Sequence, residues 1–460
     1  MQNSQTATNN IELKTLSEII DFAIGGDWGK DTSFNSGEYT EVGVIRGKEF
    51  TNWDQLKVSN PAIRRIKQSS LEKRKLQSGD LVIEISGGGP TQPVGRVVII
   101  DDAVINTSNI PLVCSNFFRL IRLNEKVNPL YIKFALDYVY QSGEVTKYQT
   151  GSTNLRNLSF TKYVDEVTIP IPNKQEQELV AETIKNWSVL NLEAKNSLLK
   201  AKHYLQKFRR SVLSAAVTGK LTEEWRRKYE VKASAIDFIK QLQKQFTKVV
   251  PVDKYEELET LPSWVECKVK NLFSVQTGST PYRKNDGYYL NGTIPWVKTG
   301  EVQNCDIYSA GEKITPLAIK ETNTKTFPIN TILIAMYGEG KTRGQVGRLK
   351  IEAATNQACA ALVNPSIPDF FNEYAYIYCL SQYSQLRQEA VGGNQPNLNL
   401  SKIKEWTVSV PPEDEQREIV NRVKKMFEYA DLVEKQIKIA GNNADKLTQS
   451  ILAKAFRGEL

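Results

Sequence analysis

The sequence predicts an α+β chain in which two mixed α/β domains are separated by two long helices. The helices are expected to pair as an antiparallel coiled coil within a pseudo-twofold internal repeat. Three observations support this fold class. Part of the chain occurs twice, each copy carries a long heptad pattern, and each heptad pattern follows a region of short apolar runs and glycine-rich loops. At 460 residues the chain is also too long for one ordinary core.

The repeat is clearest where Pro172–Leu221 aligns with Pro411–Leu460 without a gap. The identical pairs are Pro172/Pro411, Glu176/Glu415, Gln177/Gln416, Lys207/Lys446, Ser211/Ser450, Leu213/Leu452, Ala216/Ala455, Gly219/Gly458 and Leu221/Leu460. Upstream the repeat is weaker. Residues 81–97 (LVIEISGGGPTQPVGRV) are similar to 333–349 (LIAMYGEGKTRGQVGRL), and 150–159 are similar to 391–401. The changes of offset indicate loop insertions in a duplicated domain.

The heptad pattern places apolar residues at alternating spacings of three and four, as a coiled-coil seam requires. In the first copy the seam is Val180, Ile184, Trp187, Asn191, Ala194, Leu198, Ala201, Leu205, Phe208 and Val212. In the second copy it is Ile419, Val423, Met426, Ala430, Val433, Ile437, Ala440, Ala444, Leu447 and Ile451. Each helix should be about 60 Å long. Asn191 either fixes the register through a polar contact or is tolerated near a hydrated end.

The helix boundaries and the linker can also be predicted. Proline-rich, acidic segments precede both helices, and Gly219 and Gly458 suit their C-terminal caps. Beyond the first helix, Ile236, Ile239, Leu242 and Phe246 predict one more amphipathic helix. An acidic, proline-bounded linker follows, and a domain boundary is expected near Leu261.

Composition excludes several classes of protein. The chain has 60 Lys and Arg against 52 Asp and Glu, and its formal charge of +8 suits a polyanionic partner without proving one. No apolar run reaches the roughly 18 residues of a membrane span, and no secretory signal is recognisable. Five cysteines without a CxxC pair and the single His203, expected on a helix surface, predict a reduced cytoplasmic protein with no metal site.

No catalytic motif is recognisable. Gly340-Lys341-Thr342 resembles the end of a phosphate-binding loop, but Ala335 stands where that motif needs a glycine, and no helix is expected afterwards. No paired acidic residues of a nuclease and no dinucleotide-binding glycine pattern are found either. The chain is therefore predicted to bind rather than to catalyse, with no catalytic or metal-binding residues.

The candidate binding residues lie in two polar loops of each domain. In the first domain they are Ser86, Thr91, Gln92 and Arg96, followed by Gln149, Ser152, Thr153, Asn154 and Arg156. In the second domain they are Lys341, Thr342, Arg343, Gln345 and Arg348, followed by Asn394, Gln395 and Asn397. These side-chain types read base edges in DNA. The alternative is that they have only the ordinary composition of turns.

A basic run along the first helix and beyond it also has two interpretations. It could follow phosphates or an acidic partner, or it could be a solvated helix face, which is the more frequent case. The run contains Lys200, Lys202, Lys207, Arg209, Arg210, Lys220, Arg226, Arg227 and Lys228.

Several segments resemble a known family. "RRSVLSAAVTGKLTEEWR", "LTQSILAKAFRGEL", the helix openings "IPIPNKQEQELVAETI" and "PPEDEQREIVNRV", and "LPSWVECKVKNLFSVQTGSTP" are similar to the specificity (S) subunit of type I restriction-modification systems. The resemblance covers nearly the whole chain. It implies target-recognition domains at 1–165 and 261–406, a central conserved helical region and linker at 166–260, and a distal conserved helix at 407–460. The first domain lacks the LPxW opening found at Leu261–Trp264.

The resemblance also implies a function. Each target-recognition domain would read one half of a bipartite, asymmetric double-stranded DNA target, and the helices would set the half-site spacing and dock two modification (methyltransferase) subunits. Restriction (endonuclease/translocase) subunits would join the complex. S-adenosylmethionine, ATP and Mg would then bind the partner subunits, and this chain would be non-catalytic. The alternatives are a coiled-coil scaffold that holds two protein-binding domains without DNA, and an enzyme without a recognised motif.

Overall fold

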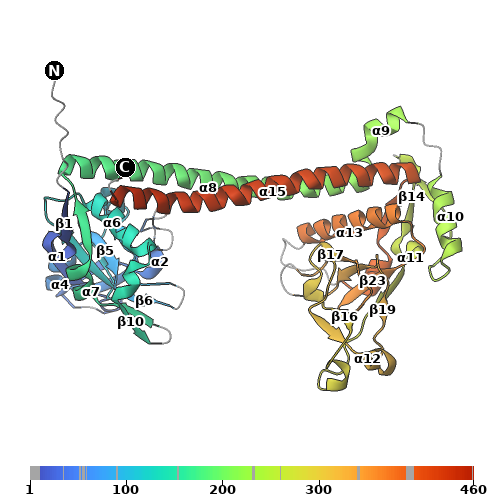
Figure 1. Cartoon of the computed structure of the whole chain (residues 1–460), viewed down its shortest axis with the longest axis horizontal. Coiled ribbons are helices and arrows are strands. Elements are labelled where there is room, and N and C mark those ends of the chain that lie inside the picture. The colour runs from blue at the N-terminus through green and yellow to red at the C-terminus, as the bar shows by residue number, and fades with distance from the viewer. Residues whose placement is uncertain are drawn as a thin grey trace. The chain divides into compact units, whose positions relative to one another are not determined.

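The computed structural model describes residues 11–459 except 35, 51, 52, 54–56, 59, 90, 91, 153, 154, 230–233, 260, 339–341, 390–397 and 458. The chain forms two compact units. The first contains Met1–Leu199 and Lys438–Leu460, and the second contains Lys200–Ile437. Two helices of 44 residues each, α8 (Lys174–Val217) and α15 (Glu413–Phe456), contribute to both units (Figure 1).

The described residues of the first unit form four sheets. The main antiparallel sheet has the order β2 (Ile20–Gly25), β9 (Phe118–Leu123), β5 (Leu81–Glu84) and β7 (Val97–Ile99). A second sheet has the order β4 (Ala62–Lys67), β3 (Tyr39–Ile45) and β8 (Leu112–Cys114), with β3 and β8 parallel. A third has the order β10 (Gln149–Ser152), β11 (Leu155–Leu158) and β6 (Ser86–Gly88), and β1 (Glu12–Thr15) pairs with β12 (Thr168–Ile171).

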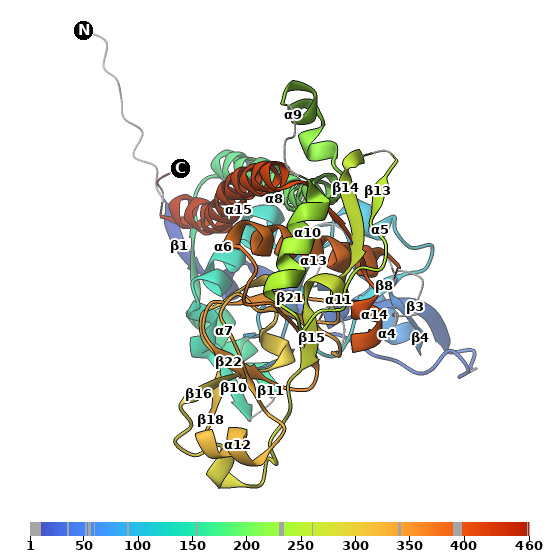
Figure 2. The same ribbon diagram turned by 90° about the vertical axis from the view of Figure 1, so that its right-hand side faces the viewer.

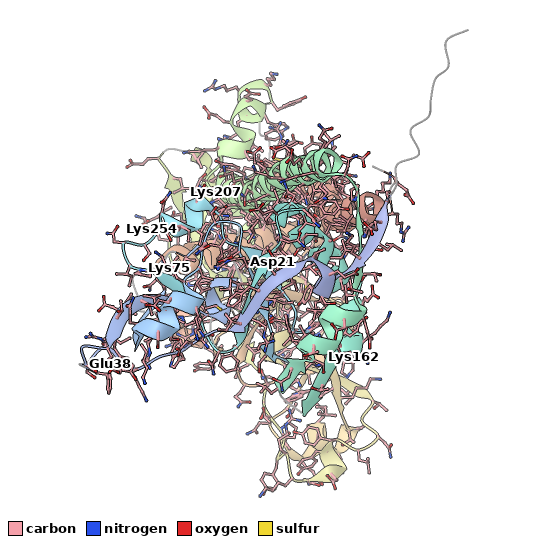
Figure 3. The ribbon with its side chains drawn as sticks, turned by 90° about the vertical axis from the view of Figure 1, so that its left-hand side faces the viewer. Asp21, Glu38, Lys75, Lys162, Lys207 and Lys254 are labelled. Atoms are coloured by element: carbon pink, nitrogen blue, oxygen red, sulfur yellow. The ribbon has the colours of Figure 1, made fainter. Side chains whose placement is uncertain are left out.

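Short helices close the first unit. They are α1 (Leu16–Ile19), α2 (Gly47–Phe50), α4 (Gln68–Arg74), α5 (Asp102–Ile105), α6 (Pro129–Gln141), the 3-10 helix η1 (Glu144–Tyr148) and α7 (Phe160–Glu166). The apolar face of α6, including Ile132 and Leu136, packs with Leu81 and Ile83 of β5 in the main core. Figure 3 labels Glu38 and Lys75, the residues just before β3 and just after α4.

In the part of the second unit that the structure describes, the strands form three sheets. One has the order β15 (Ser274–Thr277), β23 (Cys359–Val363), β20 (Ile332–Ala335), β21 (Val346–Leu349) and β17 (Cys305–Ile307). Another has the order β18 (Glu312–Ile314), β16 (Ile294–Val297), β22 (Ala353–Thr355) and β19 (Thr326–Phe327). The third has the order β13 (Glu256–Leu258), β14 (Leu261–Lys268) and β24 (Thr407–Val410).

The helices of the second unit lie around these sheets. Besides its parts of α8 and α15, the unit contains η2 (Lys220–Thr222), α9 (Glu223–Lys228), α10 (Ala235–Gln245), α11 (Val269–Leu272), η3 (Asp286–Tyr288), η4 (Thr299–Glu301), α12 (Pro316–Glu321), α13 (Asp369–Glu389) and α14 (Leu400–Lys404). The predicted amphipathic linker helix is α10. Ser234 caps its start, and Ile239 and Leu242 are buried against the domain core.

The internal repeat is confirmed by topology as well as by sequence. The order β2-β9-β5-β7 in the first unit recurs as β15-β23-β20-β21 in the second, and the parallel pair β3 and β8 recurs as β16 and β22. Matching side chains tie each domain to its long helix. The amide nitrogens of Gln177 and Gln416 donate to the carbonyl oxygens of Pro172 and Pro411. The predicted fold class, with mixed α/β domains and two long antiparallel helices, is therefore confirmed.

In the first unit the start of α8 packs against the end of α15. Ile184 of α8 and Leu452 of α15 are buried in one core. Asn191 donates from Nδ2 to the Ala444 carbonyl oxygen at 2.9 Å and to Thr448 Oγ1 at 2.7 Å. Asn191 thus makes a polar contact across the seam, which is the arrangement that the register-fixing interpretation requires.

Most of the predicted seam in these helices is buried or half-buried, namely Val180, Ile184, Leu198, Leu205, Ile419, Val423, Val433, Ile437 and Ile451. The larger exceptions are Trp187, Phe208 and Leu447, which are 45%, 39% and 41% exposed, and Ala194 and Ala440 are exposed as well. A helix with 3.6 residues per turn drifts relative to a strict heptad, so the inward position moves from Leu447 to Thr448. Trp187 nevertheless lines a small cavity between the two helices together with Thr448 and Ile451.

In the second unit the end of α8 packs against the start of α15. Val212, Leu213 and Ala216 share a core with Ile419 and Val423. Beyond α8, Gly219 adopts a left-handed conformation with φ of 72°, as its predicted capping role requires. The second predicted cap, Gly458, lies outside the described residues.

A buried carboxylate joins the helix start to the linker in the second unit. Glu415, near the start of α15, has no exposed surface. Its carboxylate accepts hydrogen bonds from Thr222 Oγ1 at 2.7 Å and from Trp264 Nε1 at 2.8 Å, and it forms an ion pair with Arg226. Trp264 belongs to the LPxW opening that only the second domain has. The repeat-equivalent Glu176 is half-buried, and within the described part of the chain its carboxylate has no hydrogen bond or ion pair.

Candidate nucleic-acid interface

The two polar loops predicted in the first domain meet in one small sheet. Strand β11 lies between β10 and β6, so the residues after β5 and the residues after η1 become neighbours (Figure 1). Ser86 Oγ donates to Asn157 Oδ1 at 2.6 Å, and Arg156 pairs with Gly88. Gln149 Nε2 donates to the Val94 carbonyl oxygen at 3.0 Å. The structure therefore brings Ser86, Gln149 and Arg156 together, although they are far apart in the chain.

Arg96 is held by an internal ion pair. Its guanidinium donates to both carboxylate oxygens of the buried Glu84, at 2.8 and 2.7 Å, and it lies over the ring of Phe50. The hydrogen bond to Glu84 raises the pKa of Arg96. With the amide orientation that satisfies its neighbours, the Gln92 side-chain oxygen accepts from Arg96. Arg96 thus orients Gln92, whose amide nitrogen is left to donate elsewhere.

The matching arginine of the second domain, Arg348, is also internal. It is buried, donates to both carboxylate oxygens of Asp306 at 2.8 and 2.9 Å, and pairs with Glu373 at 2.9 Å. These two carboxylate partners offset the free-energy cost of burying the charged guanidinium of Arg348. Reading Arg348 as a base-contacting side chain was wrong, because its guanidinium is already paired within the domain.

The other candidates have mixed outcomes. Thr342, Arg343 and Gln345 are half-buried in the turn before β21, and the strand after this turn excludes the phosphate-loop interpretation. Ser152 belongs to β10, but its side chain is outside the described residues. Also outside them are Thr91, Thr153, Asn154, Lys341, Asn394, Gln395 and Asn397. DNA contact by all these residues stays a prediction.

The structure adds a hollow that the sequence did not predict. Ser86 and Gln92 line a cavity of about 610 Å³, which is also lined by Trp28, Asn116 and Phe117. Trp28 follows β2, and the other two residues lie in the turn between β8 and β9. Phe117 and Trp28 are 45% and 38% exposed. Sequence reasoning missed them because these two turns meet only after the sheets have formed.

The basic run along α8 is partly used within the second unit. Arg209 pairs with Asp431 and Glu434 of α15, and Arg226 pairs with Glu415. Lys200, Lys202, Arg210 and Lys220 are exposed, as is His203. In the described ranges no cluster of potential metal ligands is found, and no described helix is apolar and long enough to cross a membrane.

Comparison with known proteins decides the family. The model of the type I restriction modification DNA specificity domain matches residues 9–201 and 262–440, which is most of the chain and includes both domains. The chain belongs to this specificity family.

Curated members of the specificity family are similar over much of the sequence. The EcoBI specificity subunit of Escherichia coli is 31% identical over 320 residues, covering 68% of this chain and 62% of that subunit. The EcoKI specificity subunit of Escherichia coli K12 is 28% identical over 399 residues, covering 85% of this chain and 76% of that subunit. This chain therefore spans less than two thirds of the EcoBI subunit's length.

Solved structures share the fold of the specificity family. The HsdS subunit from Thermoanaerobacter tengcongensis matches with a TM-score of 0.55 at 16% identity, covering 98% of this chain and 97% of that chain. A chain from a study of complex assembly in the type I restriction-modification system matches with a TM-score of 0.60 at 15% identity, covering 98% of both chains. At these identities the likeness concerns the fold, with its two domains and long helices.

Proposed function

We propose that this chain is the DNA sequence-recognition subunit of a type I restriction-modification complex. Each domain reads one half of a bipartite, asymmetric target in double-stranded DNA. Family membership is the observation that carries this proposal, because the family model covers both domains and the first part of each long helix.

The doubled architecture supports two separate readers. The two domains share their strand order, but their loops differ in sequence and in length. A shared framework with different loops suits two modules that bind the same kind of ligand with different specificity. Two unlike modules in one chain then recognise an asymmetric target, whereas an identical pair would require a palindromic one.

The long helices supply the spacing and the docking surfaces in this proposal. A continuous helix of 44 residues extends for about 66 Å at 1.5 Å per residue. Exposed apolar side chains at repeat-equivalent positions, Leu190 on α8 and Tyr429 on α15, are suited to holding two copies of one partner. We assign these surfaces to two modification subunits, and restriction subunits complete the complex.

The chain itself is proposed to be non-catalytic. Chemistry is then supplied by the partner subunits, which bind S-adenosylmethionine for methylation and ATP with Mg for translocation and cleavage. Recognition by this chain determines where that chemistry takes place.

The test is the binding of the full chain, with its modification subunits, to duplex DNA at several salt concentrations. Each phosphate that is neutralised contributes about −0.9 to the slope of log affinity against log salt. A steep negative slope, together with preference for one bipartite sequence, supports the proposal. Binding to protein partners alone, with no salt-dependent binding to DNA, supports the coiled-coil scaffold instead.

A further inference from the structure

We propose that the first domain reads its half-site in a groove where Trp28, Asn116 and Phe117 contact bases and Lys30, Lys67 and Lys73 contact phosphates. We call this the recognition groove. The residues of the second domain that occupy the same framework positions as the base-contacting set are Thr280, Gln357 and Ala358. This inference rests on the proposed function and identifies which side chains carry it out.

The recognition groove consists of two cavities that share lining residues. The first is the cavity of about 610 Å³ beside Ser86 and Gln92. The second, of about 660 Å³, is lined by Lys30, Lys67 and Lys73. Trp28 and Asn116 line both cavities. One continuous depression therefore has a basic part and a part with aromatic and amide side chains.

The basic part is suited to a phosphate backbone. Lys30, Lys67 and Lys73 are exposed, and within the described part of the chain their side chains form no hydrogen bond or ion pair. The carboxylate of Asp27 in the same cavity is already engaged, since it accepts from Ser70 Oγ at 2.6 Å and from the Gly29 amide. The cavity thus presents three available ammonium groups, and neutralised phosphates fix the position of a protein on duplex DNA.

The other part has the groups that distinguish bases. The exposed ring of Phe117 can contact a thymine methyl group, and the amide of Asn116 can pair with an adenine edge. Gln92 is fixed through Arg96 and Glu84, so its amide nitrogen is a pre-oriented donor. Phe117 is 45% exposed, and the ring of Trp28, with the guanidinium of Arg64 over it, is 38% exposed. Neighbouring exposed aromatic side chains beside an oriented amide are suited to a binding surface.

Backbone contacts hold the two turns of the groove together. The Gly26 amide donates to the Phe118 carbonyl oxygen at 3.0 Å, and the Asp27 amide donates to that of Cys114 at 2.9 Å. A Cβ atom at Gly26 would lie 2.1 Å from the Ser115 carbonyl oxygen, so only glycine permits this approach. Trp28 is consequently held beside the turn that carries Asn116 and Phe117. Figure 2 shows β8, which leads into this turn, near β3, β4 and α4.

The second domain repeats this framework. The Ser279 amide donates to the Thr355 carbonyl oxygen at 3.0 Å, and a Cβ atom at Gly278 would lie 1.9 Å from the same oxygen. The turns correspond as well, because Phe118 donates to Ser115 in one domain and Cys359 donates to Asn356 in the other. The glycine and the turn are therefore equivalent in the two halves.

Only the presented side chains differ between these equivalent frameworks. Thr280 replaces Trp28, Gln357 replaces Asn116, and Ala358 replaces Phe117. Thr280 and Gln357 lie within hydrogen-bonding distance of each other, so these positions also meet in the second domain. Unlike side chains on a common framework are what two readers of unlike half-sites need.

The experiment uses the full chain with its modification subunits and selects bound duplexes from a library with both half-sites randomised. The double variant N116Q/F117A should change the preferred base at one or more positions of one half-site by about 10-fold, since each good base contact is worth about 1–3 kcal/mol. The other half-site should keep its preferred bases. The variant Q357A should change the preferred bases of this other half-site and leave those of the first half-site unchanged.

The lysine variant K67A/K73A is the matched control. It should keep the preferred bases of both half-sites, weaken binding, and reduce the salt slope by about 2. Unchanged base preferences with N116Q/F117A, or equal changes in both half-sites, would overturn the proposal that the recognition groove reads one half-site. If N116Q/F117A melts at a lower temperature than the wild type, the milder F117L and N116S take its place in the same selection. A wild-type chain that selects no bipartite sequence would instead overturn the proposed function.

Discussion

Replacing Glu415 with alanine removes the centre of a buried hydrogen-bond network in the second unit. The carboxylate accepts from Thr222 and Trp264 and pairs with Arg226, whose side chain is largely buried. Breaking a buried ion pair by removing one partner costs about 3–5 kcal/mol. Arg226 keeps a hydrogen bond to the Gly219 carbonyl oxygen, so the lower end, about 3 kcal/mol, is expected for E415A.

The matched control is E176A, at the repeat-equivalent position near the start of α8. Both glutamates gain about 0.3–1 kcal/mol from the positive end of their helix. Only Glu415 has the additional hydrogen-bond network, so the difference in stability between E415A and E176A measures the contribution of this network. For a unit of this size, 1 kcal/mol corresponds to about 2–4 °C in Tm, so E415A should lower the unfolding transition of the second unit by about 6–12 °C.

Differential scanning calorimetry of the two variants and the wild type measures this difference. The E176A protein should melt within about 4 °C of the wild type, because it loses only the interaction with the helix end. Equal destabilisation by E415A and E176A would refute the reasoning, because it would mean that the network adds nothing to the common helix-start effect.

Four further predictions concern the helices, the loops and the cysteines. Inserting one heptad into both α8 and α15 lengthens each helix by about 10 Å, which is the length of about three base pairs. A methylation assay on gapped targets should then show a different tolerated gap between half-sites and the same preferred bases in each half-site. A change in the preferred bases would contradict the proposal that helices set the spacing and domains read the bases. The variant N191A loses two hydrogen bonds across the seam, so its free energy of unfolding in urea titrations should be lower than that of the wild type by about 1 kcal/mol. An unchanged free energy of unfolding would show that these hydrogen bonds do not stabilise the helix pair. Replacing Lys341 and Arg343 with alanine should weaken one half-site only in footprinting, and equal loss at both would count against separate readers. Burial raises the pKa values of the thiols of Cys114, Cys267, Cys359 and Cys379 to about 12, so these thiols stay protonated at pH 8. Iodoacetamide should therefore label only the exposed Cys305 in the folded protein and all five cysteines in the unfolded protein, as measured by mass spectrometry.

The long helices and the repeat could be predicted from the sequence because their signals are local. Heptad spacing and the gapless match of Pro172–Leu221 with Pro411–Leu460 need no knowledge of tertiary contacts. The exposure of Trp187 and Leu447 could not be predicted in the same way. An idealised heptad ignores the drift of a real helix, and only the contact of Asn191 with Thr448 shows which face turns inward.

The candidate site was predicted less completely because its residues come from distant turns. Arg96 and Arg348 looked like base-reading arginines, yet their partners Glu84, Asp306 and Glu373 become neighbours only in the folded sheets and helices. Trp28 gave no local signal, since a single aromatic residue after a strand is ordinary. The close approach that Gly26 and Gly278 permit was the one available hint, and it can be recognised only once the repeat is aligned on the structure.

We propose that two unlike domains in one chain read two unlike half-sites of a single duplex. Sequencing methylated adenines in the DNA of cells that carry this chain and its modification subunits measures this directly. We expect methylation within two short, different sequence blocks separated by a gap of constant length and free sequence. One uninterrupted block, a palindrome, or methylation that does not depend on this chain would contradict the proposal that the two domains read separate half-sites.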